Sequence, residues 1–186
     1  MNVETDGVVQ RHLGPNERLL WSGRPAQGIV FRSSDLFMIP FSLLWGGFAF
    51  FWEYTVVVSE RAPVFFMLWG VPFVAIGLYV IVGRFLLDAK QRANTVYAVT
   101  NQRVIILSGL MNAKTKSLSL RTLSDVSLDE KPDGRGSISF GPSMMPGWWA
   151  GGMAWPGMPS PAPAFDLIDN PRSVFELIRH AQETRT

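Results

Sequence analysis

Two long runs without a charged residue constrain this chain most. The stretches from Leu36 to Trp52 and from Ala62 to Gly83 contain no Asp, Glu, Lys or Arg. As a helix, the second run would reach roughly 33 Å, and the hydrocarbon core of a bilayer is about 30 Å thick. The first run is shorter, but it gains length if Tyr54 sits at the membrane interface, where Trp and Tyr are favoured. The sequence therefore predicts two transmembrane helices, at about 36–54 and 62–83.

The connection between these runs is too short to hold a domain, so we expect a helical hairpin. Ser42 and Gly46 stand four residues apart, and Gly70 and Gly77 stand seven apart. Small residues on one helix face allow two membrane helices to approach closely. Glu53 is expected at the interface, and neither apolar run contains an ionisable residue. Packing is therefore favoured over a channel, proton relay or transport role.

The basic residues near the two runs predict the orientation of the hairpin. Several arginines precede the first run, and Arg84, Lys90, Arg92 and Arg103 follow the second, whereas the connection holds only Arg61. Segments rich in Lys and Arg usually remain on the cytoplasmic side. Both termini are therefore expected in the cytoplasm.

Composition argues against several classes of function. The chain has no cysteine and only two histidines, His12 and His180, neither with a partner at metal-ligand spacing, so no metal, cofactor or Ser-His-Asp site is expected. The net charge is only +2 and no dense Lys/Arg cluster occurs, so no nucleic-acid partner is expected. The acidic residues in the segment 125–166 are scattered over turn-like positions, which does not suggest a paired general acid and base. These acids are Asp125, Asp129, Glu130, Asp133 and Asp166. We therefore expect no enzyme.

Beyond the second run, the pattern changes to short β-rich segments. Expected strands cover 95–100, 103–108, 115–120, 126–128, 137–140 and 164–168, separated by turn residues. Asn170 is expected to cap a final helix with Pro171 at its first position. The expected divisions are a leader at 1–35, the hairpin and juxtamembrane segment at 36–92, and a domain at 93–186. Residues 1–14 are expected to be polar and mobile, and Leu19 to Trp21 to form a short amphipathic piece packed on the domain.

Four segments resemble the bacterial pleckstrin-homology-like (PH-like) membrane proteins. They run from Glu17 to Pro25, Tyr97 to Ile106, Gly134 to Gly141 and Phe165 to Asn170; the turn Thr100-Asn101-x-Arg103 is the most specific part. The resemblance implies an antiparallel PH-like roll or barrel with a C-terminal helix at one end, held at the bacterial inner membrane. Most relatives of this kind have no assigned activity.

The segment 141–163 is apolar yet rich in Gly and Pro, which excludes a helix or a central strand. It is expected to be a long loop that covers its own domain, enters the bilayer interface, or contacts a partner protein. The contact residues would be Met144, Met145, Trp148, Trp149, Met153 and Trp155. Copper binding by the methionines, Met158 included, is a weaker alternative, since no His or Cys is nearby.

Four basic residues are candidates for contact with anionic lipid: Arg103, Lys114, Lys116 and Arg121. They are too few around the first hairpin turn to suggest a phosphoinositide site, and solvated surface charge is the simpler interpretation. The sequence thus favours a membrane-anchored interaction module, acting as a scaffold or accessory subunit for a membrane-protein partner. The alternative is binding of lipid or a small hydrophobe by the domain or its loop.

Overall fold

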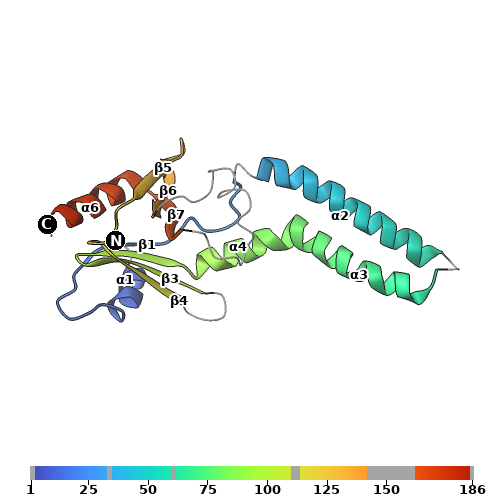
Figure 1. The fold of residues 1–186 in the computed structure, drawn as a ribbon, viewed down its shortest axis with the longest axis horizontal. Helices are drawn as coiled ribbons and strands as arrows, with labels where there is room; N and C mark the ends of the chain where they lie inside the picture. The colour runs from blue at the N-terminus through green and yellow to red at the C-terminus, as the bar shows by residue number, and fades with distance from the viewer. Residues whose placement is uncertain (1–2, 33–34, 60–61, 110–113, 142–161, 185–186) are drawn as a thin grey trace. The chain divides into compact units, whose positions relative to one another are not determined.

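The computed structural model describes residues 3–32, 35–59, 62–109, 114–141 and 162–184. These residues fall into two compact units, one with the apolar helices and one with the strands (Figure 1). The helical unit contains α2(Asp35–Val58), α3(Val64–Leu78), a π-helical segment η1(Tyr79–Gly83) and the start of α4(Arg84–Ala93). The other unit contains α1(Val3–Gln10), β1(Leu19–Gly23), β2(Val96–Thr100), β3(Arg103–Ser108), β4(Lys114–Ser119), β5(Val126–Glu130), β6(Arg135–Phe140), β7(Ala164–Asp169) and α6(Pro171–Glu183).

Small residues hold α2 and α3 close together, as predicted. Ser42 and Gly46 of α2 and Gly70 and Gly77 of α3 are all buried. A Cβ atom added to Gly77 would lie only 3.3 Å from the Cα atom of Gly46. The two helix backbones therefore approach each other where side chains are absent.

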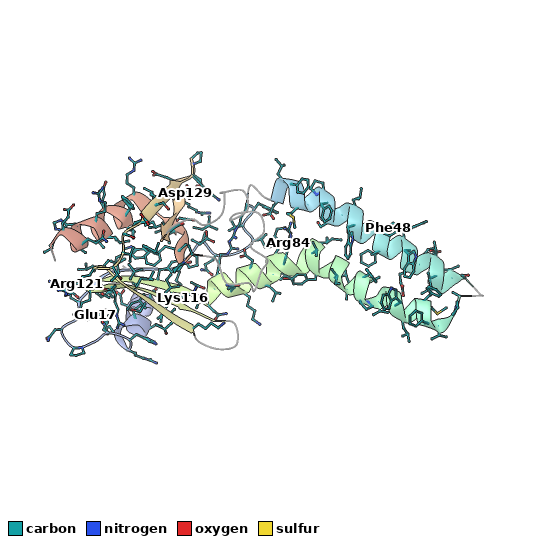
Figure 2. All side chains as sticks on the ribbon, in the orientation of Figure 1. Glu17, Phe48, Arg84, Lys116, Arg121 and Asp129 are labelled. Atoms are coloured by element: carbon teal, nitrogen blue, oxygen red, sulfur yellow. The ribbon has the colours of Figure 1, made fainter. Side chains whose placement is uncertain are left out.

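Large apolar side chains cover the outside of this pair. Leu44 is 76% exposed and Phe48, labelled in Figure 2, is 66% exposed. A solvent-facing helix would place polar groups here, whereas lipid favours apolar ones. Helix α2 and the continuous helix Val64–Ala93, which comprises α3, η1 and α4, are each long and apolar enough to cross a membrane.

The contact between α2 and α3 differs from the sequence expectation at Glu53. Helix α2 continues to Val58, so Glu53 lies within the helix and not at its end. Its Oε2 atom is buried against Gly70 and has no hydrogen-bond partner among the described residues. An ionisable residue just beyond the charge-free run therefore takes part in this packing, because the missing side chain of Gly70 leaves space for its carboxylate.

An ion pair joins the open ends of the two helices. Asp35 at the start of α2 lies 3.0 Å from Arg84, and both side chains are 11% exposed. The other oxygen of Asp35 accepts a 2.7 Å hydrogen bond from the backbone N–H of Arg32. The guanidinium of Arg84 also lies 4.4 Å from the ring centre of Phe85. These contacts fix α2 against the segment that follows α3.

The strands form two antiparallel sheets, of order β1-β2-β3-β4 and β5-β6-β7. All six expected strands are present, within a few residues of the expected bounds. Leu19 to Trp21 pack on the domain as expected, and they do so as part of β1, which pairs with β2 through Gly23 and Tyr97. In the described residues the strands form a PH-like roll of two sheets and not a closed barrel.

The main core lies between the two sheets and α6. Alternate residues of β2 and β3, such as Val99 and Val104, point into it because side chains alternate along a strand. Phe165 of β7 is fully buried and its ring centre lies 4.6 Å from that of Tyr97. Helix α6 contributes Val174, Ile178 and Ala181, as its helical spacing predicted.

The first residues of α6 differ in detail from the prediction. Pro171 stands at the start of the helix as expected, but the side chain of Asn170 makes no capping hydrogen bond. Asn170 adopts a left-handed conformation with φ of 49°, which asparagine tolerates better than most residues. Its role is therefore to turn the chain sharply from β7 into α6.

Helix α1 is an element of the domain that the sequence expectation missed. Its Val9 is fully buried and packs with Val96, Ala98 and Ile105 on the other face of the β1–β4 sheet. The segment expected to be polar and mobile therefore covers a second, smaller core.

Candidate functional site

The β1–β4 sheet has one end at which the chain leaves for the helical unit and returns from it. Strand β1 ends at Gly23 and β2 begins at Val96, and Gly23 pairs with Tyr97. Lys114 pairs with Ser108 at this same end. Arg103 pairs with Ser119 at the opposite end of the sheet. We call these the tethered end and the free end.

The most organised polar group of the domain lies at the free end. The guanidinium of Arg103 donates to the Oε1 atom of Glu17 at 2.8 Å and to its Oε2 atom at 2.9 Å. The Glu17 side chain is only 3% exposed. Arg103 also donates to the backbone oxygen of His12 at 2.9 Å and to the Ser117 hydroxyl at 3.2 Å. Arg103 therefore joins the N-terminal segment to β3 and β4.

The Thr100-Asn101-x-Arg103 turn supplies the rest of this arrangement. The Thr100 hydroxyl donates to Glu17 at 2.7 Å and accepts the backbone N–H groups of Gln102 and Arg103. The Asn101 side chain accepts the N–H of Arg18, and the Asn101 N–H donates to the Arg18 carbonyl. The motif that carries the family resemblance therefore hydrogen-bonds to Glu17 and Arg18, and so links the segment before the hairpin to the β2–β3 turn after it.

These contacts set the ionisation of both charged groups. Burial alone would raise the pKa of Glu17, but hydrogen bonds from Arg103, Gly14 and Thr100 and the charge of Arg103 outweigh it and lower the pKa to about 2. The hydrogen bonds to Glu17 raise the pKa of Arg103, against the opposing effect of burial. Both groups are charged at physiological pH.

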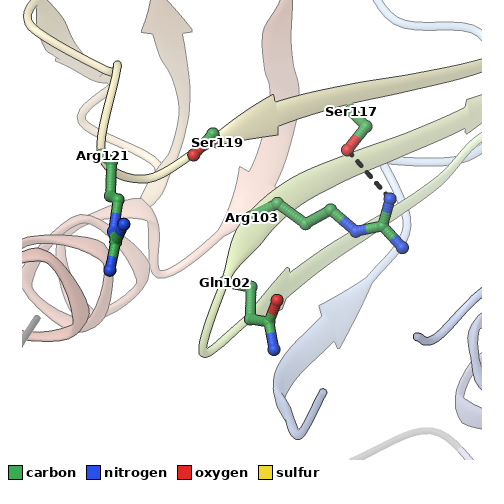
Figure 3. A pocket seen from close by; sticks show the side chains of 5 residues that line it. All are labelled: Gln102, Arg103, Ser117, Ser119 and Arg121. Carbon is green, nitrogen blue, oxygen red and sulfur yellow. Dashed lines mark hydrogen bonds between the residues drawn. The ribbon is translucent and has the colours of Figure 1, made fainter. Parts of the chain in front are cut away.

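The four basic residues predicted to contact anionic lipid do not form one cluster. Arg103 and Arg121 line an open depression at the free end, together with Gln102, Ser117 and Ser119 (Figure 3). Lys114 and Lys116 are exposed on β4 toward the tethered end, and Figure 2 shows Lys116 and Arg121 well apart. Most of the donors of Arg103 are used by Glu17, His12 and Ser117 together. Lipid contact by any of the four stays a prediction.

The residues predicted for partner or membrane contact in the loop lie outside the described residues. They are Met144, Met145, Trp148, Trp149, Met153 and Trp155, and the proposed roles of the loop stay predictions.

The acidic residues of the domain are placed by local structure. Glu130 pairs with Arg172 at 3.0 Å, and Asp133 accepts the backbone N–H of Arg135 within a turn. Asp166 accepts a 2.9 Å hydrogen bond from Ser137, a neighbour in the sheet. In the part of the chain that the structure describes, no three His, Cys, Asp or Glu residues come together as a metal site.

Sequence reasoning missed Glu17 as the partner of Arg103. Both residues belong to segments that carried the family resemblance, so their joint presence was the available signal. The pairing itself could not be read, because the whole hairpin separates them in the sequence.

Comparison with known proteins supports the resemblance. A family model described as "Bacterial PH domain" matches residues 36–144, which is more than half of the chain. None of the curated proteins and none of the solved structures gave a match. The match covers α2, α3 and strands β2 to β6, and the two-sheet roll with a C-terminal helix agrees with it. The chain therefore belongs to the bacterial PH domain family.

Proposed function

We propose that this protein is a membrane-anchored interaction module that acts as a scaffold or accessory subunit and carries out no catalysis. One observation supports the anchoring above all. Strand β1 precedes the hairpin in the sequence and β2 follows it, yet the two strands pair. Both ends of the hairpin must therefore lie on the same side of the membrane, which requires that two helices cross it or that none does. The apolar exteriors of α2 and α3 favour crossing.

The proposed location is the bacterial inner membrane, with the PH-like domain and both termini in the cytoplasm. The basic residues that flank the hairpin support this side, since Lys and Arg are retained there. A module confined in this way meets membrane partners at a raised effective concentration. PH-like domains commonly serve as interaction modules, which fits a non-catalytic role.

The proposed partner is another membrane protein, and the proposed contact is the loop 141–163. Its Trp and Met residues offer large, adaptable contact area, and its prolines reduce the entropy lost on binding. The tryptophans are Trp148, Trp149 and Trp155.

Crosslinking and copurification from native membranes test this proposal. Wild type is compared with a variant in which residues 144–158 are replaced by a Gly/Ser segment of equal length, so that the connection between β6 and β7 keeps its length. A second variant replaces only the three tryptophans by alanine. We expect both variants to lose a specific partner while amide exchange in β2 and β3 is unchanged. Recovery of the same partner with both variants would contradict the loop as contact.

Lipid binding by the domain is a second candidate function. The exposed Lys114 and Lys116 point to it, because they lie toward the tethered end, and each basic group near an anionic surface adds about 1 kcal/mol. The full chain is placed in nanodiscs of phosphatidylcholine with or without phosphatidylglycerol. Paramagnetic lipid headgroups should broaden β4 signals only in the anionic discs. Equal broadening in both kinds of disc would contradict this candidate.

A further inference from the structure

Among the described residues, strand β4 is paired on one side only. It pairs with β3 along Lys114 to Ser119, and it is the last strand of its sheet. Every residue of β4 except Leu118 is exposed. An edge strand of this kind presents a row of free backbone N–H and C=O groups to its surroundings.

The register identifies which backbone groups are free. The N–H of Leu120, directly after β4, donates to the carbonyl of Gln102 at 3.1 Å. Backbone groups of successive residues point alternately to the two sides of a strand. The even-numbered residues of β4 therefore bond to β3. Thr115, Ser117 and Ser119 direct their N–H and C=O groups away from the sheet, although the Ser119 carbonyl already accepts hydrogen bonds from the N–H and hydroxyl groups of Thr122.

The charged residues of β3, β4 and their flanking turns are all basic. The sequence from 101 to 124 contains no Asp or Glu, and its charged residues are Arg103, Lys114, Lys116 and Arg121. Lys114 and Lys116 lie on one face of β4, and Ser117 and Ser119 lie on the other with Arg103 and the depression. Among the described residues Arg121 has no hydrogen-bond or ion-pair partner. Glu17 balances the charge of Arg103, so an incoming strand would meet unbalanced positive charge at Lys114 and Lys116 on one face and at Arg121 on the other.

We infer that the outer edge of β4 docks an acidic, extended segment of a partner protein, which adds a strand to the β1–β4 sheet. Backbone hydrogen bonds would hold the segment, and its acidic side chains would meet Lys114, Lys116 and Arg121. Pairing of β4 with β4 of a second copy is disfavoured, because lysines would then face lysines across the strands. Headgroup oxygens of a bilayer could accept from single N–H groups of this edge, but only another strand matches its alternating N–H and C=O groups in register. This inference rests on the proposed role as an interaction module and names the chemistry of one partner.

The test uses the full chain in phosphatidylcholine nanodiscs and a short peptide in which Glu alternates with Val. A peptide with Lys in place of Glu and one with a central proline serve as probes of charge and of strand formation. We expect only the Glu-Val peptide to bind, and to slow amide exchange at Thr115, Ser117 and Ser119. Binding of the Lys peptide with equal affinity would overturn the inference.

Two matched variants separate backbone pairing from general attraction. Ser117→Pro removes an N–H that makes no bond to β3, so the sheet tolerates it, whereas Ser117→Ala keeps that N–H. We expect Ser117→Pro to weaken peptide binding about tenfold or more and Ser117→Ala to bind as wild type does. Equal binding by the two variants would overturn the inference. The inference would also be overturned if Ser117→Pro abolished self-association of the protein and left peptide binding unchanged. The occupant of the β4 edge would then be a second copy of the chain.

Charge reversal gives an independent measurement. Lys114→Glu with Lys116→Glu should abolish binding of the Glu-Val peptide and create affinity for the Lys peptide. Lys131→Glu changes an exposed lysine in the turn of the other sheet and should change neither. An equal effect of the Lys131 variant would overturn the inference. Because the peptide reports on β4 alone, a partner recovered through the loop with no peptide binding would contradict the inference and leave the proposed function intact.

Discussion

Glu17 and Arg103, which are 86 residues apart in the sequence, form a bidentate ion pair. Arg103 Nε lies 2.8 Å from Glu17 Oε1, and Arg103 Nη2 lies 2.9 Å from Glu17 Oε2. The carboxylate is almost fully buried and the guanidinium is one-third exposed. The pair joins the segment before the α2–α3 hairpin to β3. Its role is therefore structural, and together with the bonds to His12 and Ser117 it leaves Arg103 few donors for an external ligand.

Removing the arginine from this pair should destabilise the domain. Arg103→Leu leaves the buried Glu17 carboxylate without its cation, and we expect a loss of about 2 to 4 kcal/mol in the free energy of unfolding. Arg121→Leu is the matched control, because Arg121 is exposed, and it should change stability by less than about 0.5 kcal/mol. Amide exchange in β2 and β3 of the full chain measures both. Equal effects would contradict the structural role of the pair.

The stability of the domain should fall in acid through Glu17. Its pKa is lowered from an ordinary value of 4.5 to about 2, so its contribution is fully present above pH 4.5 and is lost as the pH falls toward 2. Glu17→Gln should remove this part of the pH dependence and leave the contributions of the other carboxyl groups. Acid unfolding of wild type and variant followed by circular dichroism measures the difference. A constant difference in stability from pH 5 to 2 would contradict the lowered pKa.

Helix α1 should contribute to the stability of the domain through one face. Val9 is fully buried and Val8 is 38% exposed, so the two neighbours form a matched pair. Val9→Ala should cost about 1 to 3 kcal/mol, whereas Val8→Ala should cost less than about 0.5 kcal/mol. Thermal unfolding of the full chain detects the difference. Similar melting temperatures for the two variants would show that α1 does not pack as described.

Gly70 should be essential to the pairing of α2 and α3. A Cβ atom there would overlap the Glu53 carboxylate, whereas nothing lies within 4 Å of a Cβ added to Gly47. We expect Gly70→Ala to destabilise the pair by about 1 to 3 kcal/mol and Gly47→Ala to be nearly neutral. Resistance of the helices to dodecyl sulfate, followed by circular dichroism, measures this. Gly70→Ala combined with Glu53→Ala should recover stability if the clash is the cause.

Much of the fold could be predicted because local patterns determine it. The charge-free runs located α2 and α3, and alternation with turn residues located β2 to β7. Helix α1 could not be predicted, because Val8 and Val9 are its only well-defined apolar pair and its stability comes from the sheet beneath it. Asn170 was expected as a cap since its residue type suits that role, but the sharp turn after β7 requires a left-handed residue.

The candidate site was less accessible to sequence reasoning. Basic residues could be listed, but their grouping depends on strand register, which places Arg103 and Lys114 at opposite ends of one sheet. Glu17 reaches Arg103 because the adjacent strand β1 pairs with β2. The sequence predicted only a short amphipathic segment there, and not a strand. The contact of Glu53 with Gly70 could not be predicted either, because α2 extends beyond the expected end at about Tyr54.

The pairing of β1 with β2 also has a consequence for biogenesis. As the chain leaves the ribosome, β1 and Glu17 emerge first, but Tyr97 and Arg103 emerge only after both apolar helices have been made. If the hairpin crosses a membrane, as proposed, the domain can be completed only after both helices have inserted and both ends of the hairpin lie on one side. A chain in which only one helix inserted would leave β1 and β2 on opposite sides of the bilayer, unable to pair. Formation of the β1–β2 pair would then depend on correct insertion of the whole hairpin.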